Sequence, residues 1–304
     1  MAEFTEIECC VNGMTLRGRR WGEGHPQRVL ALHGWLDNCA SFMPLADELW
    51  ALDPNRFDLI AIDLAGHGRS DHRPGLSAYN IWQDLIELEF GMDALGWGSF
   101  SLLGHSRGAL IASLFAVIYP QRVAKLALIE GLIPAPVEEQ NCIEQLRLAL
   151  EGIKRFYKKP NNYYASFDAA VKARQEGFTP LNYTDAELLS ERGVRKNEHG
   201  YYWSNDSKLL APSEVKFTSG MVDQYLQRLA QLTGLIKSEQ NEVDGLVPLI
   251  LINAKQGLLD LYRSQVDYLA QYSRAQIHYL AGDHHLHMSQ GAKTVAPLIQ
   301  KFFE

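Results

Sequence analysis

Residues 100–112 read FSLLGHSRGALIA, and this stretch carries the strongest structural signal in the chain. An apolar run is followed by the turn Gly104-His105-Ser106-Arg107-Gly108 and then by a second apolar run. A strand, a sharp turn and a helix in this order form a nucleophile elbow, which lifts a serine hydroxyl clear of a sheet. Side chains at the two glycines would strike the neighbouring strand or helix. The pentapeptide alone is weak evidence, but its position between an extended and a helical run favours Ser106 as a nucleophile.

The composition limits what the chain can do. With 304 residues it can hold one large α/β domain, or a core with an insertion, and bury a substantial core. Its residues are 46% hydrophobic and 21% charged, which is ordinary for a globular protein. The formal charge of −7 argues against a nucleic-acid partner and against a basic membrane-binding face.

The cysteines and the first residues indicate a cellular compartment. The four cysteines, Cys9, Cys10, Cys39 and Cys142, lack zinc-type spacing, and a vicinal pair rarely forms a disulfide. Free thiols are typical of a reducing environment. The opening residues MAEFTE lack the apolar segment of a signal peptide, and no apolar run reaches the length of a membrane helix. We therefore expect a soluble cytoplasmic protein.

Extended and helical patterns alternate along the first part of the chain. Helical patterns cover residues 44–49, 79–95 and 109–119, and short apolar runs typical of doubly buried strands cover residues 29–32, 59–62 and 123–129. Residues 15–21 read as a half-exposed antiparallel strand. This alternation predicts a mostly parallel central sheet with helices on both faces.

The pattern changes at Pro134. From there to about Gly245 strand signals vanish, helical stretches cover residues 138–157, 163–176 and 221–232, and aromatic residues are frequent. Strands then resume at residues 247–252 and 276–280, and a helix over residues 289–303 closes the chain. We therefore predict a core over residues 1–133 and 246–304, with a helical cap (a lid) inserted at residues 134–245.

A serine nucleophile needs a base, and in this architecture the histidine comes last in the chain. Residues 282–287, Gly-Asp-His-His-Leu-His, follow the last predicted strand. His284 lies beside the strand end and is the favoured base, with His285 as the alternative. The spacing of these histidines has neither an i,i+4 pair nor a nearby cysteine or carboxylate set, so we expect no metal.

The acid that would orient the base is not at its usual place. After the strand 247–252, Gln256 stands where a carboxylate is expected, and an amide cannot stabilise the charge of an imidazolium ion. Glu130 instead ends the strand that follows the elbow helix, at the carboxyl edge of the sheet where sites form in open α/β folds. Burying a glutamate there without a role would be costly. We favour Glu130 as the acid, with Asp260 as the alternative.

The oxyanion that develops during acyl transfer needs hydrogen-bond donors. One donor is expected to be the backbone N–H of Arg107, directly after the nucleophile. The second is expected in the loop His33-Gly34-Trp35-Leu36-Asp37-Asn38, after the strand at residues 29–32, where we choose the backbone N–H of Trp35. The Trp35 side chain could also line the pocket.

These motifs together resemble the α/β-hydrolase superfamily, and within it most closely the serine hydrolase-like proteins. The segments that carry the resemblance are HGWLDN at 33–38, DLAGHGRS at 63–70, the elbow, LSERG at 189–193 and HHLHMS at 284–289. The resemblance implies the α/β-hydrolase fold and a triad acid on the strand after the elbow helix, which supports Glu130. It makes Asp63 a structural turn residue. It also implies hydrolysis of an ester or related acyl bond without a metal or organic cofactor.

Three functions fit this site. The first is a carboxylic-ester hydrolase in which Ser106, His284 and Glu130 act as a catalytic triad on a small, partly apolar molecule. The same triad could serve carbon–carbon bond hydrolysis or cofactor-free perhydrolysis, which a panel of esters, vinylogous diketones and peroxide with acetate would separate. The third function is a ligand-binding receptor with little turnover. In that case a ligand should stabilise the protein against thermal unfolding, and its turnover should be slower than its binding.

Overall fold

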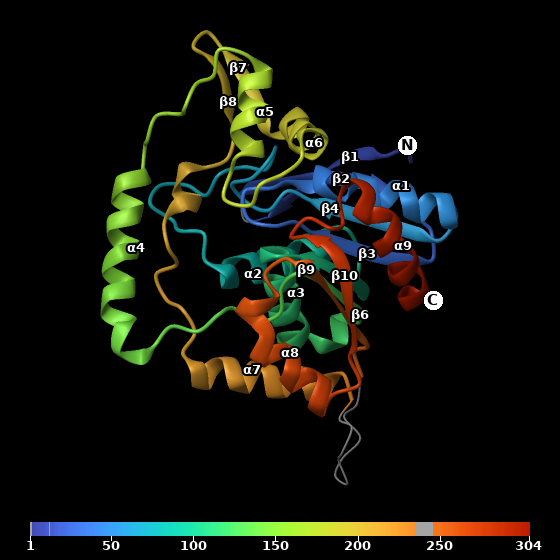
Figure 1. Ribbon diagram of the computed structural model, residues 1–304. Coiled ribbons are helices and arrows are strands. Elements are labelled where there is room, and N and C mark those ends of the chain that lie inside the picture. The colour runs from blue at the N-terminus through green and yellow to red at the C-terminus, as the bar shows by residue number, and fades with distance from the viewer. Residues whose placement is uncertain (1, 12, 235–245) are drawn as a thin grey trace.

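The computed structural model describes residues 2–11, 13–234 and 246–304, and its main feature is an eight-stranded sheet in the order β1-β2-β4-β3-β5-β6-β9-β10 (Figure 1). From β4 to β10 all neighbouring strands are parallel, whereas β2 pairs antiparallel with both β1 and β4. The predicted parallel sheet with one antiparallel early strand is therefore confirmed. The strands are β1 (Thr5–Val11), β2 (Met14–Trp21), β3 (Gln27–Leu32), β4 (Phe57–Ile62), β5 (Phe100–His105), β6 (Val123–Ile129), β9 (Leu249–Gln256) and β10 (Gln276–Asp283).

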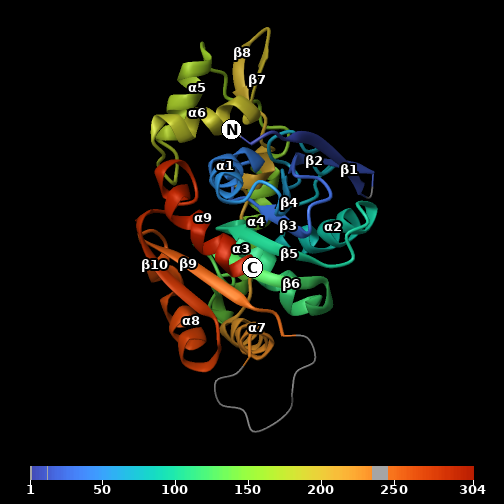
Figure 2. The same cartoon turned by 90° about the vertical axis from the view of Figure 1, so that its right-hand side faces the viewer.

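Helices cover both faces of this sheet, as Figures 1 and 2 show. Successive strand residues point to opposite faces, so Leu30 and Leu32 join one apolar cluster while Val29 and Ala31 join the other. The first cluster includes side chains of α2 (Ile81–Ala94), α3 (Arg107–Ile118), α7 (Ser219–Leu232) and α8 (Leu259–Tyr272). The second includes side chains of α1 (Met43–Leu52) and α9 (Ser289–Phe303).

The inserted segment contains α4 (Cys142–Phe156), α5 (Phe167–Gln175) and α6 (Tyr183–Gly193), together with a two-stranded hairpin of β7 (Val194–Asn197) and β8 (Gly200–Trp203). The prediction that this segment holds no strands is therefore wrong. Each hairpin strand has only four residues, too few for a periodic signal. The hairpin gains a further pairing from Tyr164, which exchanges backbone hydrogen bonds with Tyr201.

Helix α7 lies within the predicted insertion but packs as part of the core. Its side chains Val222, Leu226 and Leu229 join the apolar cluster that contains α3. The last part of the predicted insertion, residues 235–245, lies outside the described residues. We use the word cap below for residues 134–218, the part of the insertion before α7.

Two expectations about cysteines and membrane helices can be compared with the structure. All four cysteines lie in the described part of the chain and are free thiols, as predicted. Among the described residues, no helix has both the length and the apolar character needed to cross a bilayer.

The glycines of the elbow are as crowded as predicted. A Cβ atom on Gly104 would lie 2.5 Å from the Cα of Ala109, and one on Gly108 would lie 1.9 Å from the carbonyl oxygen of Leu32. Strand β3 and helix α3 therefore approach each other at a distance that only glycine allows. This contact holds the start of α3 against the sheet.

Replacing Gly108 with alanine should therefore destabilise the fold by roughly 3 kcal/mol or more, because the neighbouring backbone cannot make room for the methyl group. Gly98→Ala is the matched control, since no heavy atom lies within 4 Å of a Cβ placed there. Urea denaturation would compare the free energies of unfolding. Equal losses in the two variants would contradict this account of the elbow.

Candidate active site

Ser106 occupies a strained backbone position between β5 and α3. Its φ and ψ angles are 51° and −117°, outside the regions that L-residues prefer. Its N–H donates to the carbonyl of Ile129 at 2.9 Å, and its carbonyl accepts from the N–H groups of Ala109 and Leu110. The serine is thus held between the end of β6 and the first turn of α3, as the strand–turn–helix pattern predicted.

Positive φ values concentrate in the segments that the sequence singles out. Among the described residues other than glycine, φ is positive at Leu36, Ser106, Glu130, Lys158 and Ser289. The first three of these belong to the predicted oxyanion loop, the nucleophile and the acid. Strained backbone persists only where the surroundings enforce it, and it clusters at functional sites. The distribution therefore supports a site at this edge of the sheet.

The structure brings two of the predicted catalytic residues into contact. The Nδ1 atom of His284 lies 3.1 Å from Oε2 of Glu130, although the residues are 154 positions apart. An ionised carboxylate can only accept, so Nδ1 carries the proton of this hydrogen bond. In the neutral imidazole, the other ring nitrogen, Nε2, is then the one that can accept a proton.

The Glu130 carboxylate is buried and held by the end of β9 and the turn that follows it. Oε1 accepts from the N–H of Ala254 at 2.6 Å, and Oε2 accepts from the N–H of Leu258 at 2.7 Å. A Cβ on Gly257 would lie 2.0 Å from Oε2. The segment after residue 252, where a carboxylate was first expected, thus supplies the N–H groups that hold the Glu130 carboxylate. Gln256 in this segment accepts a hydrogen bond from the N–H of Gly282 through its side-chain oxygen.

The two alternative residues lie elsewhere, so neither alternative is supported. The Asp260 side chain is 92% exposed and pairs with Arg263 one turn along α8. His285 is buried, but its Nε2 lies 3.2 Å from Oδ2 of Asp37, away from Glu130. His284 and His285 are adjacent in the chain, but His284 contacts Glu130 and His285 contacts Asp37.

The predicted oxyanion donors flank the elbow. Arg107 is the first residue of α3, and the first N–H groups of a helix have no partner within it. The Arg107 guanidinium group donates to Asp84 at 2.6 Å, so the side chain is bound to Asp84 and the proposed donor is the backbone N–H alone. Trp35 lies three residues after β3, in a turn closed by a hydrogen bond from the N–H of Asp37 to the carbonyl of Gly34.

One cluster of metal-type side chains occurs among the described residues: Asp37, His105 and His285, with donor atoms within 4.8 Å of one another. Arg174 of the cap already donates to Oδ1 of Asp37 at 2.7 Å. Burial alone would raise the pKa of Asp37, but His285 and Arg174 outweigh burial and hold this pKa well below its usual range. The cluster is thus a charge-compensated ion pair, a poor fit for an additional cation.

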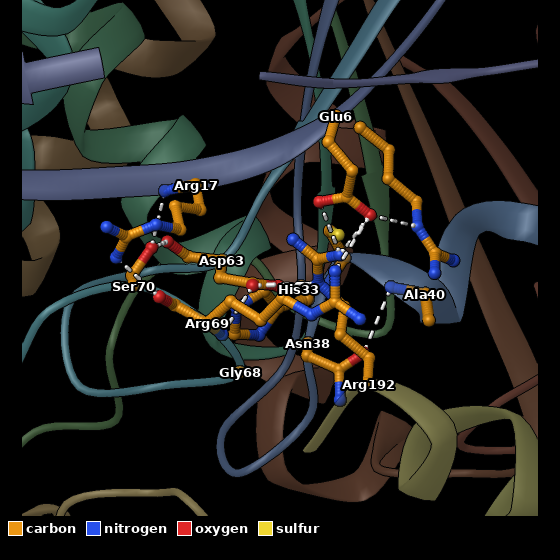
Figure 3. A network of polar contacts seen from close by, with 12 residues as sticks. Glu6, Arg17, His33, Asn38, Ala40, Asp63, Gly68, Arg69, Ser70 and Arg192 are labelled. Carbon is orange, nitrogen blue, oxygen red and sulfur yellow. Dashed lines mark hydrogen bonds and ion pairs between the residues drawn. The ribbon is translucent and has the colours of Figure 1, made fainter. Parts of the chain in front are cut away.

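Asp63, expected to be a turn residue, anchors the cap (Figure 3). Its carboxylate accepts from the N–H groups of Cys39 and Arg69, both at 2.8 Å, and pairs with the guanidinium of Arg192 in α6. Figure 3 shows the Arg192 side chain reaching on to Glu6 of β1, which accepts at 2.8 and 2.9 Å. The LSERG motif therefore docks the cap onto the core.

Two cavities share Trp35 in their linings, and Ser106, Glu130 and His284 are among the lining residues of neither. One, of about 250 Å³, lies between the oxyanion loop and the cap and is lined by several of the cap's aromatic residues. The other, of about 310 Å³, includes Tyr79 and Arg107. Other cap aromatics pack on each other, such as Tyr163 on Tyr202. The aromatic cavity-lining residues of the first cavity are Trp35, Tyr164, Phe178 and Trp203.

Asp37 and Arg174 are residues that the sequence did not single out. Asp37 lies within the HGWLDN segment, so its position in a motif was the available signal. Arg174 is one of several charged residues on an amphipathic helix, and nothing in its local sequence distinguishes it.

The family model for the α/β hydrolase fold matches residues 27–290. The chain belongs to this family. A serine hydrolase-like protein of Danio rerio is 27% identical over 95% of this chain and 85% of its own length. Serine hydrolase-like protein 2 of Homo sapiens is also 27% identical, over 99% of this chain and 94% of its own. A crystal structure of a hypothetical protein from Pseudomonas aeruginosa PAO1 superposes with a TM-score of 0.86 at 33% identity, covering 98% of this chain and 99% of that one.

Both the predicted fold and the resemblance to the serine hydrolase-like proteins are thus confirmed. In this α/β hydrolase, the strands that carry the elbow, Glu130 and the turn that holds Glu130 are adjacent in the sheet. Because parallel strands end at the same edge, side chains far apart in the sequence meet there.

Several buried histidines should make the stability of this α/β hydrolase depend on pH. Burial lowers the pKa of His33, His67, His105 and His287 from the usual value of 6.5. Below about pH 6.5 the unfolded chain therefore binds more protons than the folded chain, and stability should fall by up to about 1.4 kcal/mol per pH unit for each such histidine.

His287→Leu should reduce this slope by up to about 1.4 kcal/mol per pH unit, because the fully buried ring has no hydrogen-bond partner among the described residues. Free energies of unfolding in urea between pH 7.5 and about 5.5 would give the slope. His199→Leu, at a ring that is 64% exposed, is the control. If the slope of stability against pH were unchanged in His287→Leu, the lowered pKa of His287 would not be a cause of the pH dependence.

Proposed function

We propose that this α/β hydrolase cleaves a carboxylic ester through an acyl-enzyme formed on Ser106. The observation that carries the proposal is the contact between Glu130 and His284, which in the neutral imidazole leaves Nε2 as the proton acceptor. A serine hydroxyl is a poor nucleophile near neutral pH without such a base. The buried carboxylate orients the ring and stabilises the imidazolium that forms during reaction.

The reaction would proceed in two halves. Ser106 Oγ attacks the ester carbonyl while His284 Nε2 takes its proton; the carbon–oxygen bond to the alcohol then breaks, and His284 returns the proton to the departing alcohol. In the second half, His284 deprotonates a water molecule that attacks the acyl-enzyme. The acid is released and Ser106 regains its proton. No redox partner or metal is required by this balance.

The backbone N–H groups of Arg107 and Trp35 would bind the oxyanion. Each such donor typically lowers the barrier by ~3 kcal/mol, because it is already oriented before charge develops. The aromatic cavity beside Trp35 favours an ester with an apolar alkyl or aryl group. The relatives named serine hydrolase-like support the same chemistry.

The first test is reaction with a fluorophosphonate, which labels activated serines. Intact mass should show a single adduct on the wild-type chain and none on Ser106→Ala, since the hydroxyl is the attacking group. A panel of p-nitrophenyl esters would then show turnover that Ser106→Ala lacks. A folded wild-type chain that neither forms the adduct nor hydrolyses any ester would refute the proposal.

The acid can be tested separately. Glu130→Gln should lower kcat by at least about 100-fold, because the amide no longer stabilises the imidazolium. Asp260→Asn is the matched control and should stay within about twofold of wild type, because its side chain is exposed and away from the histidine. The opposite pattern in ester hydrolysis would show that Glu130 is not the acid.

A further inference from the structure

The loop that carries the predicted oxyanion donor is bound to the cap at every residue from 35 to 38. The Trp35 indole N–H donates to the cap at 3.0 Å, and the Leu36 carbonyl accepts from the cap at 3.1 Å. Asp37 accepts at 2.7 Å, and the Asn38 side chain donates at 2.9 Å. Trp35 donates to the Leu209 carbonyl, and Leu36 accepts from the Asn205 side-chain amide. Asp37 accepts from the Arg174 guanidinium, and Asn38 donates to the Leu189 carbonyl.

One of these contacts differs from the others because it is an ion pair. The side chains of Asp37 and Arg174 are 2% and 10% exposed, so both charges are largely withdrawn from water. Removing one partner of such a pair leaves the other charge buried and uncompensated, which is strongly unfavourable. The pair therefore holds α5 and the loop in one relative position.

The Asp37 carboxylate also packs against the peptide that carries the oxyanion donor. A Cβ on Gly34 would lie 2.9 Å from Oδ2 of Asp37, and the Trp35 N–H belongs to the Gly34–Trp35 peptide bond. The N–H of Asp37 closes the same turn by donating to the Gly34 carbonyl at 3.2 Å. A displacement of Asp37 would therefore move this donor.

The same carboxylate reaches the loop of the base. Its Oδ2 lies 3.2 Å from Nε2 of His285, the residue next to His284. On the other side of the cluster, Nε2 of His105 lies 2.8 Å from the backbone carbonyl of His284 and donates to it. Asp37 thus lies where the cap, the oxyanion loop and the base loop meet.

We propose that Asp37 and Arg174 are positioning residues: through their ion pair, the cap holds the Trp35 N–H and the His284 loop in their reactive arrangement. The cap is then part of the catalytic framework as well as a wall of the cavity beside Trp35. This inference rests on the proposed function, because it assigns the pair to the chemistry of Ser106.

The inference predicts a specific kinetic signature. The Trp35 N–H would act on charge that develops in the transition state, so its displacement should lower kcat and leave KM nearly unchanged. Arg174 also lines the aromatic cavity, and a residue that only bound substrate would raise KM instead. The two roles can therefore be separated.

The experiment compares Arg174→Gln with Lys172→Gln, a control on the same helix whose exposed ion pair with Asp168 does not reach the loop. The readouts are kcat and KM on a p-nitrophenyl ester and the second-order rate of fluorophosphonate labelling, with thermal unfolding to check the fold. Arg174→Gln should lose at least about tenfold in kcat and in labelling rate, with KM within about twofold of wild type. Lys172→Gln should match wild type.

A double-mutant cycle with Asp37→Asn should show coupling, because both substitutions break one ion pair: the double variant should be little worse than the poorer single variant. If Arg174→Gln does not fold, Arg174→Met replaces it, since it removes the charge but keeps an unbranched side chain that can fill the same space. The same fall in kcat at unchanged KM is then expected. An unchanged kcat in that variant would overturn the inference.

Other outcomes distinguish this inference from the proposed function. A wild-type chain without labelling or turnover would refute the function itself. Normal labelling of the wild type with unchanged kcat in Arg174→Gln would overturn only the positioning role, as would a change confined to KM. Loss of wild-type activity on treatment with 1,10-phenanthroline would also overturn it, because the reaction would then depend on a metal ion, for which Asp37, His105 and His285 are the candidate ligands.

Discussion

The buried ion pair between Asp63 and Arg192 joins the cap to the core of the sheet. Both side chains are fully buried, and charges withdrawn from water are tolerated only when they are paired and hydrogen-bonded. Asp63 lies just after β4 and receives the N–H groups of Cys39 and Arg69, whereas Arg192 comes from the cap and continues to Glu6 of β1. The first strand, the turn after β4 and the cap are therefore held together at one point.

The same physical solution occurs three times along the carboxyl edge of the sheet. Asp63, Asp37 and Glu130 are buried carboxylates that combine backbone N–H donors or a closed turn with at least one cationic or imidazole partner. In the first two pairs the partner is an arginine of the cap, which holds the structure in place. In the third the partner is His284, whose side chain is 11% exposed and so able to face a substrate. This third pair is the one to which we assign proton transfer in the proposed reaction.

The sequence predicts the framework well because local patterns decide it. Buried strands such as residues 29–32 and 59–62 are continuous apolar runs, and the final helix was predicted with the bounds that the structure shows, Ser289–Phe303. Strand β1 was not predicted: four of its seven residues are exposed, and it contains no continuous apolar run. The cap hairpin was missed because four-residue strands leave no periodic signal, and α7 was assigned to the cap because its amphipathic pattern does not say which surface it covers.

The sequence by itself determined the elbow at Ser106 and the histidine loop after the last strand, since glycine spacing and strand ends are local features. It also narrowed the acid to Glu130 or Asp260. Only the tertiary structure decided which partners the carboxylates contact. Glu130 contacts His284, which is 154 residues away in the chain, and Asp37 contacts Arg174 and His285, which are 137 and 248 residues away. Such contacts depend on which strand ends are neighbours in the sheet and on how the cap docks. Local sequence patterns carry no information about contacts between residues that are so far apart in the chain.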